Sequence, residues 1–235
     1  MRVLVVQNFD GTPLGQLSTA LEEAGAQVEF LRPHHGDALP ETIGDFSAMI
    51  VLGGGQNALA DDAHPYFPKL LQLMRGFSDA DRSVLGICLG SQLLARAYHA
   101  ENIIGGASEF GWHEVSLTED GRDDPLFLGV PSEFPIFHWH DDTFILPRGA
   151  TRLAGNITTH NQAFRLGRAA YGVQFHFEAN VPVVEQWNEE FSEWLARSQP
   201  DWPKRYPQEA ARHAETADAV GLKMARNWVA TIRSA

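Results

Sequence analysis

Residues 83–92 read Ser83-Val84-Leu85-Gly86-Ile87-Cys88-Leu89-Gly90-Ser91-Gln92 and predict a short buried strand that runs directly into a helix. The only cysteine of the chain, Cys88, lies at the corner between the two. Gly86 and Gly90 let the backbone turn tightly around it. A nucleophile on such a turn forms a nucleophile elbow, and the helix N-terminus favours the reactive thiolate. The alternative is that Cys88 is a small buried hydrophobic residue, as free cysteines often are.

Composition and charge argue against several classes of protein. The chain has 235 residues, of which 44% are hydrophobic and 20% charged, so a sizeable core is expected rather than disorder. Its net charge of −12 argues against nucleic acid or an anionic membrane surface as the main partner. A single cysteine suits a reducing compartment, and no apolar run has the length of a signal peptide or a membrane span. We therefore expect a soluble cytoplasmic protein.

Apolar runs and their spacing predict an α/β fold. Parallel strands buried on both faces are expected at residues 2–7, 27–31, 48–52 and 83–87, with helices at 14–24, 65–75 and 89–99. Alternating strands and helices with crossovers indicate a doubly wound, flavodoxin-like mixed sheet with helices on both faces. Later strands, some of them antiparallel, are expected at 114–118, 134–139, 151–154, 163–166 and 170–177.

The C-terminal tail is predicted to be helical. Helices are expected at 182–198 and 208–233, with prolines at 200, 203 and 207 breaking the chain between them. The last helix either docks on the domain or faces a partner, and docking is the interpretation we favour. Without repeats or a linker, the sequence predicts one domain over residues 1–235, with a core over about 1–180 and a helical extension over about 181–235.

A thiol nucleophile needs a base, and residues 171–178, Tyr-Gly-Val-Gln-Phe-His-Phe-Glu, supply the strongest candidate. His176 and Glu178 are two residues apart on a predicted strand and would point to the same face. A carboxylate beside an imidazole fixes its tautomer and stabilises the imidazolium. The alternative is an ordinary polar strand face, but this strand is otherwise apolar.

Three glycines, Gly53-Gly54-Gly55, directly follow the strand at 48–52. They form either a flexible turn or a loop whose N–H groups point into an active site. Neither of the glycine-rich phosphate-binding fingerprints is present.

The blocks at 86–92 and 172–178 resemble the two signature blocks of class I, triad-type glutamine amidotransferases, and Gly53-Gly54-Gly55 falls where that family has its oxyanion loop. This resemblance covers residues 1 to about 180. Residues 137–144 and the helical tail resemble the stand-alone branch often labelled GMP-synthase-like, less specifically. Ser91 stands where the family commonly has His, and the glycine loop lacks the family's usual proline.

The resemblance implies roles for individual residues. Cys88 would be the nucleophile, His176 the base and Glu178 its orienting acid. The N–H of Leu89, with that of Gly54 or Gly55, would form the oxyanion hole. Gln92 would help to hold glutamine, and the segment with His140 and Asp141 would border the same pocket. Taken together, the residues with an expected catalytic or binding role are Cys88, His176, Glu178, Gly54, Gly55, Leu89, Gln92, His140 and Asp141.

The segment His138-Trp139-His140-Asp141-Asp142 also resembles a metal-binding pattern, because two histidines stand two residues apart beside carboxylates. We favour a strand end that lines the pocket mouth, since no cysteine or further spaced histidine completes a ligand set. The sequence therefore predicts no metal and no cofactor.

Three functions remain open. An amidotransferase of this kind would release ammonia from glutamine and deliver it to a separate ATP-dependent synthase, because no ATP-binding motif is present. A self-contained hydrolase would cleave glutamine or another small γ-glutamyl compound. A non-catalytic regulatory homologue is the third, and the intact Cys88, His176 and Glu178 argue against it. The sequence leaves open whether the chain forms a homo-oligomer.

Overall fold

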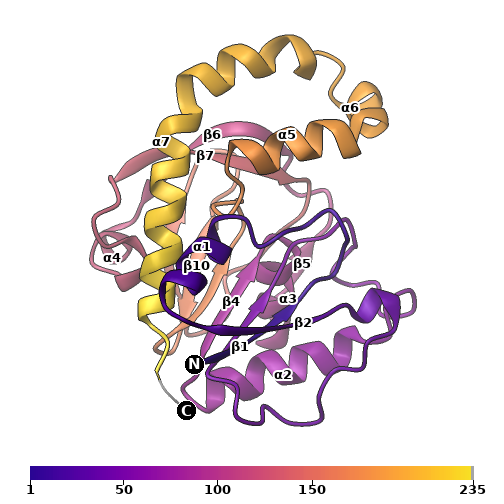
Figure 1. Ribbon diagram of the computed structural model, residues 1–235, viewed down its shortest axis with the longest axis vertical. Helices are drawn as coiled ribbons and strands as arrows, with labels where there is room; N and C mark the ends of the chain where they lie inside the picture. Colours follow the sequence, from indigo (N-terminus) through magenta and orange to yellow (C-terminus); the bar gives the residue numbers. More distant parts are fainter. Residues whose placement is uncertain (234–235) are drawn as a thin grey trace.

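The computed structural model describes residues 1–233, and a nine-stranded mixed sheet runs through its centre (Figure 1). The strands lie in the order β2-β1-β3-β4-β11-β10-β9-β6-β7. In that order their bounds are Gln27–Leu31, Arg2–Val6, Ala48–Val51, Ser83–Ile87, Ala170–Val173, Ala163–Leu166, Thr151–Gly155, Glu109–Leu117 and Glu133–His140. Each of the nine strands expected from the sequence forms, although several differ in length.

Five neighbouring strands, β2, β1, β3, β4 and β11, are parallel. β3 and β4 are buried along their whole length, which explains their unbroken apolar sequences. The carboxyl ends of parallel strands meet at one edge of a sheet, where ligands bind in open α/β folds. The segments that follow β1, β3, β4 and β11 therefore converge, and they contain Cys88 and His176.

The other strands, β10, β9, β6 and β7, are joined by antiparallel pairing. β6 begins at Glu109, well before the predicted start at residue 114, because it pairs with the full length of β7 from Glu109↔His140 to Ser116↔Glu133. Gly111, at a φ of 97°, interrupts the apolar alternation that would have revealed the first half of this strand.

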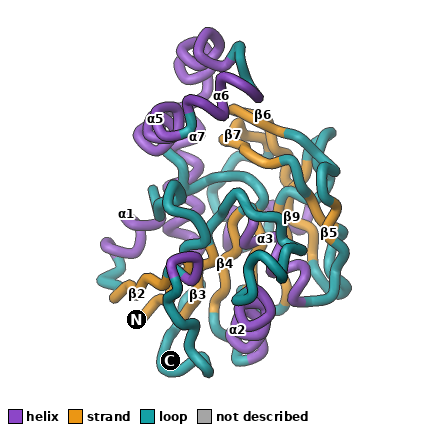
Figure 2. Tube along the Cα trace, turned by 90° about the vertical axis from the view of Figure 1, so that its right-hand side faces the viewer, coloured by secondary structure: helices purple, strands orange, loops and turns teal. Residues whose placement is uncertain are grey.

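Helices cover both faces of the sheet (Figure 2). α1 (Gln16–Glu23) and α7 (Trp202–Ala230) lie on one face, and α2 (Phe67–Asp79) and α3 (Leu89–Ala97) on the other. Successive residues of a strand point to opposite faces. Val3 and Val5 accordingly pack with the first pair of helices, whereas Leu4 and Val6 pack with the second. The predicted doubly wound fold with helices on both faces is confirmed.

The C-terminal segment forms α5 (Val181–Glu190), α6 (Ser192–Ser198) and α7. The expectation that prolines delay the last helix to residue 208 is wrong. Pro203 stands in the first turn of α7, where its missing N–H has no intrahelical acceptor to lose, and Pro207 lies inside the helix. α7 packs along α1 and β7, so this helix docks on the sheet, as Figure 1 shows. Residues 234–235 lie outside the described part of the chain.

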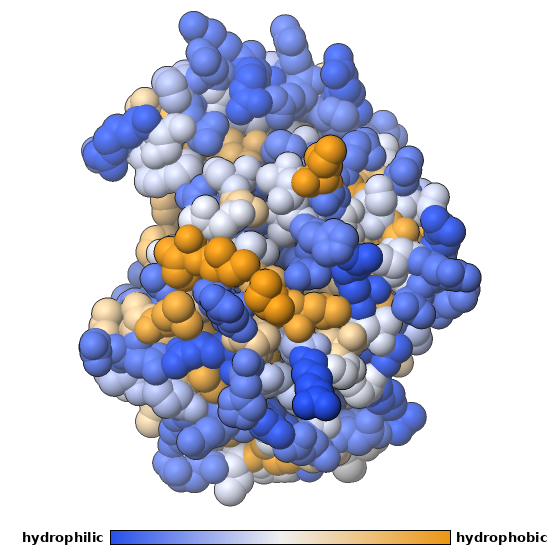
Figure 3. All heavy atoms as spheres, turned by 180° about the vertical axis from the view of Figure 1, so that it is seen from behind, coloured by the Kyte–Doolittle hydropathy of each residue, from blue (hydrophilic) through white to orange (hydrophobic). Residues whose placement is uncertain are grey.

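Small elements complete the chain. They are the 3₁₀ turns η1 (Pro33–His35) and η2 (Pro125–Phe127), the short helix α4 (Glu119–Arg122), and a two-stranded sheet of β5 (Asn102–Ile103) and β8 (Thr143–Phe144). Figure 3 shows a band of hydrophobic residues across the face opposite to that of Figure 1. Exposed apolar side chains include Ile103, Ile104, Ile145 and Ile157. Among residues 1–233, the helices are all too short or too polar to cross a membrane.

The docking of α7 predicts the effect of substitutions along this helix. Trp228 is fully buried between α7 and the sheet. Trp228→Ala should lower the free energy of unfolding by about 3–5 kcal/mol, because it removes a large core side chain and leaves a cavity. Urea denaturation followed by circular dichroism measures this change. The exposed Glu215→Ala on the same helix should stay within about 0.5 kcal/mol of the parent. Equal stability of both variants would show that α7 does not dock.

Candidate active site

The predicted elbow is formed by the last residue of β4, Cys88 and the start of α3. Cys88 has a φ of 51° and a ψ of −110°, a conformation that side chains other than glycine rarely adopt. Its N–H donates to Val173 O of β11 at 2.8 Å, which fixes the turn to the neighbouring strand. Such a strained backbone persists only where the surroundings hold it, and it is typical of functional sites.

Both glycines of the elbow stand where a side chain cannot fit. A Cβ atom on Gly86 would lie 2.2 Å from Gly90 O, and one on Gly90 would lie 2.0 Å from Val51 O. The start of α3 therefore rests directly on the backbones of β3 and β4. The sequence-based interpretation that these glycines permit the tight turn agrees with these contacts.

A cavity of about 420 Å³ opens above the elbow. Cys88 lines it and is 6% exposed. Most of the predicted site residues also line this cavity: Gly54, Gly55, Gln92, His140, Asp141 and His176. Glu178 lies behind His176, and Leu89 is buried at the first position of α3. The structure thus gathers the predicted residues in one place.

His176 and Glu178 are paired, but not on a strand. β11 ends at Val173, and both residues lie in the turn that leads to α5. The predicted strand over 170–177 is therefore too long. The chain leaves the ladder because the His176 N–H donates to Phe137 O of β7, at 2.8 Å, and no longer to a neighbour of β11. His176 Nδ1 lies 2.7 Å from Glu178 Oε1, and both side chains are buried.

The environment of His176 favours its charged form. Burial lowers the pKa of this imidazole, but the Glu178 carboxylate and the Cys88 thiol outweigh burial and raise the pKa from 6.5 to about 10. His176 is therefore protonated at neutral pH. Its Nδ1–H points to Glu178, which leaves Nε2 as the ring atom that can serve a partner in the cavity.

The turn that carries His176 and Glu178 is held by helices from both ends of the chain. Gln16 of α1 donates its backbone N–H to Glu178 O at 2.9 Å and its side-chain amide to Phe177 O at 3.1 Å. Gly221 of α7 packs so closely that a Cβ there would lie 2.2 Å from Phe177 O. The C-terminal helix thus contributes to the position of the candidate base.

The glycine loop lies beside the cysteine and the histidine. A Cβ on Gly53 would lie 3.2 Å from His176 Cε1 and 3.5 Å from Cys88 Cβ, so this position also requires a glycine or a small shift of its neighbours. Gly54 and Gly55 follow and line the cavity. Leu89 begins α3, and the first N–H groups of a helix have no intrahelical acceptor. These N–H groups are candidates for holding a negative oxygen near Cys88.

The other predicted binding residues form a polar wall. Gln92 Nε2 lies 3.4 Å from both Asp142 O and Gln174 Oε1. His140 Nδ1 donates to Asp142 O at 3.0 Å. The Asp141 carboxylate accepts a hydrogen bond from Ser108 Oγ at 2.6 Å. This wall therefore combines amide donors and acceptors with one carboxylate at the rim.

Sequence reasoning missed the aromatic side of the cavity. Trp139 of β7 faces Trp187, Phe191 and Trp194, which come from α5, α6 and the junction between them. Their spacing predicts an apolar helix face, and such a face ordinarily packs into a core. Trp187 also donates its indole N–H to Gly11 O at 2.6 Å, tying the loop after β1 to this wall. No signal in the sequence distinguishes an aromatic residue that lines a cavity from one that fills a core.

Two groups of histidines and carboxylates lie near the cavity. Glu109, His138 and His140 form a buried group. Burial lowers the pKa of His138 far below its usual range. Burial alone would raise the pKa of Glu109, but its contacts with His140 and His138 hold that pKa well below its usual range.

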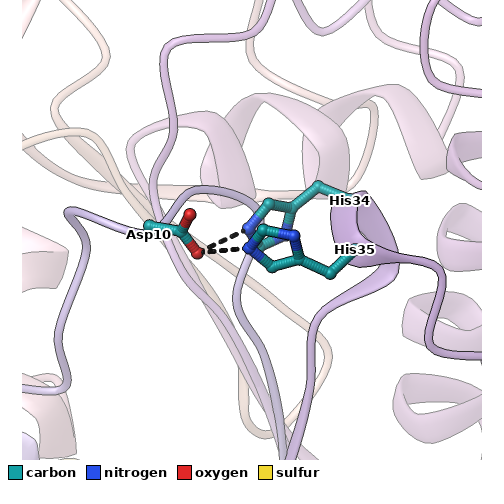
Figure 4. Close-up of side chains that lie close together, drawn as sticks. All are labelled: Asp10, His34 and His35. Carbon is teal, nitrogen blue, oxygen red and sulfur yellow. Dashed lines mark hydrogen bonds and ion pairs between the residues drawn. The ribbon is translucent and has the colours of Figure 1, made fainter.

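The second group, Asp10, His34 and His35, is largely exposed (Figure 4). His34 Nε2 and His35 Nε2 lie 3.0 and 2.7 Å from the same oxygen, Asp10 Oδ1. Hydrogen bonds from the two rings hold the pKa of Asp10 below its usual range.

Comparison with known proteins agrees with the resemblance seen in the sequence. The family described as glutamine amidotransferase class-I matches residues 5–184. The glutamine amidotransferase-like protein YfeJ of Salmonella typhimurium is 32% identical over 202 residues, covering 85% of this chain and 84% of YfeJ. One separately encoded chain of the glutamine-hydrolysing GMP synthase of Archaeoglobus fulgidus is 28% identical, covering 76% of this chain and 89% of that one. A glutamine amidotransferase crystal structure from Thermotoga maritima superposes with a TM-score of 0.83 at 28% identity, covering 97% of this chain and 96% of the other. The chain therefore belongs to the class I glutamine amidotransferase family.

Proposed function

We propose that this protein hydrolyses the side-chain amide of glutamine to glutamate and ammonia through a thioester on Cys88. One observation carries the proposal: a cysteine in a strained strand-to-helix turn shares a cavity with a buried His176–Glu178 pair. This arrangement combines a nucleophile, a base and an orienting acid. Family membership supports amide hydrolysis as the chemistry.

In this proposal His176 takes the proton of Cys88 and forms an imidazolium–thiolate pair. The thiolate attacks the carboxamide carbon of glutamine. His176 then gives its proton to the departing ammonia, and a glutamyl thioester remains. Water, deprotonated by His176, cleaves the thioester and releases glutamate and the thiol. Glu178 stabilises the imidazolium in both halves of the cycle, which the raised pKa of His176 supports.

The tetrahedral intermediate carries a negative oxygen that needs hydrogen-bond donors. We assign this role to the N–H of Leu89 with that of Gly54 or Gly55. Preorganised donors of this kind are often the largest single contribution to catalysis. The absence of side chains on the glycines lets the substrate approach the backbone closely.

The polar wall fits the amino-acid end of the substrate. Gln92 and the segment with His140 offer amide and carbonyl groups, and the Asp141 carboxylate suits a substrate ammonium group. The chain would act as one domain, with the C-terminal extension completing the cavity through Trp187 and its neighbours. A thiol nucleophile also suits the reducing cytoplasm.

The ammonia would pass to a separate ATP-dependent synthase. The similarity to a GMP synthase that is named as one of several chains supports an arrangement in two chains. The apolar residues exposed on and beside β5 and β8, Ile103, Ile104 and Ile145, are of the kind that protein partners cover.

A second candidate function is hydrolysis of a larger γ-glutamyl compound without a partner. The aromatic wall formed by Trp139, Trp187, Phe191 and Trp194 favours it, because a cavity of about 420 Å³ with such a wall offers apolar contacts that glutamine alone does not use.

Removal of the thiol tests the proposed nucleophile. Cys88→Ser and Cys88→Ala should lower ammonia release from glutamine by at least about a thousandfold, because no other residue supplies the covalent intermediate. A coupled glutamate dehydrogenase assay measures this rate. Circular dichroism should show an unchanged fold.

Cys88 is the only cysteine, so a glutamine-analogue affinity label should modify the parent once and the variants not at all. Undiminished turnover by Cys88→Ala would refute the mechanism, and a wild-type chain that neither turns over nor takes up the label would favour a regulatory homologue.

The raised pKa of His176 predicts how stability depends on pH. The folded-state value of about 10 exceeds the unfolded value of 6.5, so protonation of His176 stabilises the fold fully below pH 6.5. That stabilisation disappears as the pH rises through 10. Glu178→Gln removes the charge that sustains it. The stability difference between parent and variant should therefore be largest below pH 6.5 and shrink towards pH 10, as measured by urea midpoints. Glu189→Gln, at an exposed position of α5, should show no such trend, and a pH-independent difference for Glu178→Gln would contradict the ion pair.

The isolated chain should distinguish the two functions. If a synthase is required, ammonia release from glutamine should be slow alone and rise when a purified synthase with its ATP-activated acceptor is added. Rapid cleavage of γ-glutamyl amines or peptides by the chain alone would instead establish the hydrolase. The ratio of the two kcat/KM values measures the preference.

A further inference from the structure

The buried group of Glu109, His138 and His140 is built by strand pairing. His138 and His140 are two apart on β7 and point to the same face. Glu109 is the antiparallel partner of His140 on β6, and directly opposite residues share a face. The third side chain is therefore supplied from across the sheet, where sequence spacing gives no hint of it.

The hydrogen bonds of His140 determine what must lie between it and Glu109. His140 Nδ1 is 3.0 Å from Asp142 O, and because a carbonyl oxygen can only accept, Nδ1 carries a proton. A neutral ring then has a lone pair on Nε2. This atom faces Glu109 Oε2 at 3.2 Å, so two acceptors oppose each other. A proton or a metal cation between them removes the conflict.

His138 distinguishes these two solutions. Its side chain is 0% exposed, and Nδ1 lies 3.9 Å from the same Glu109 Oε2. Within residues 1–233, neither of its ring nitrogens has a hydrogen-bond partner. A buried polar atom without a partner is costly. A proton shared by Glu109 and His140 leaves both nitrogens of His138 unsatisfied, whereas a metal ion would engage His138 Nδ1, His140 Nε2 and Glu109 Oε2 together.

The surroundings resemble those of bound metals. Ligating groups are usually oriented by further hydrogen bonds to their other atoms. Asn156 donates to Glu109 Oε1 at 2.6 Å, and Gln162 donates to Glu109 Oε2 at 2.7 Å. Asp142 O orients the ring of His140. Two of the three ligands are thus already fixed by neighbours.

The distances suit a small tetrahedral ion. Ligands bound to zinc at about 2.1 Å lie roughly 3.4 Å apart in a tetrahedron. The separations of 3.2 and 3.9 Å from Glu109 Oε2 bracket this value, and all three ligand atoms lie within 4.8 Å of one another. His140 lines the catalytic cavity, which gives an ion a way in.

We propose that Glu109, His138 and His140 bind one divalent ion of the zinc class, a structural metal that joins β6 to β7 behind the catalytic cavity. Two imidazoles and a carboxylate are ordinary zinc donors. By fixing His140, the ion would also steady the neighbouring segment with Asp141, which borders the cavity. The binding itself is independent of the proposed glutamine chemistry.

The exposed group of Asp10, His34 and His35 must be removed from the experiment, because surface imidazoles also bind transition metals. His34→Ala/His35→Ala therefore serves as the parent. The purified full-length parent is stripped with a chelator, titrated with Zn²⁺ or Co²⁺ by calorimetry, and analysed for metal after dialysis. We expect one ion per chain, visible Co²⁺ absorption of a four-coordinate site, and a higher thermal midpoint with metal.

Two further variants in that parent locate the ion. His138→Gln should weaken metal binding at least tenfold. His113→Gln is the matched control, because His113 packs edge-on against His138, with 5.5 Å between ring centroids, while its Nε2 bonds to Phe110 O. This control should bind metal as the parent does.

A parent that retains no stoichiometric metal and shows no Co²⁺ absorption would overturn the proposal, whether or not the His138 variant folds. Equal binding by His138→Gln and His113→Gln would overturn it as well. In either case a protonated His140 paired with Glu109 would explain the cluster. Because metal content is the readout, failure here leaves the Cys88 mechanism untouched, and failure of that mechanism leaves this test valid.

Discussion

The close approach of three backbones at the elbow is the constraint on which the rest of the structure depends. Gly90 rests on Val51 O of β3, and Gly86 rests on Gly90 O, so α3 starts without any intervening side chain. This contact forces Cys88 into a conformation with a positive φ and directs it to the edge where the parallel strands end. A methyl group at either glycine would separate the helix from the sheet, and the cysteine would lose its place beside the glycine loop.

The elbow supplies only half of the site, and the other half depends on contacts distant in sequence. The turn with His176 and Glu178 is free of strand pairing, so other elements must hold it. Gln16 binds it from α1, Phe137 from β7, and Gly221 presses on it from α7. The C-terminal helix is thus coupled to the candidate base, and the tail cannot be regarded as an appendage to a complete catalytic core.

The sequence predicted the nine strands, the doubly wound fold and the elbow because these follow from local patterns: apolar runs, alternation and glycine spacing. It predicted the proximity of His176 and Glu178 but gave the wrong local structure, since the hydrogen bond from His176 to Phe137 is nonlocal. Trp187 and its neighbours were indistinguishable from core residues for the same reason. Glu109 belongs to the buried cluster only through the register of β6 on β7, which single-sequence reasoning did not reach.

Two carboxylate–imidazole pairs lie under one cavity, and their neighbours decide what each can do. His176 has Glu178 on one side and a thiol on the other, so its charge has a use: the proton can move to and from a reacting group. His140 has Glu109 on one side, a carbonyl on the other and a second imidazole close by, so no atom of this group is free to exchange a proton with a substrate. A carboxylate that faces two imidazoles rather than one imidazole and a thiol is suited to holding a cation in place. The same pairing of residue types therefore supports chemistry at one site and structure at the other.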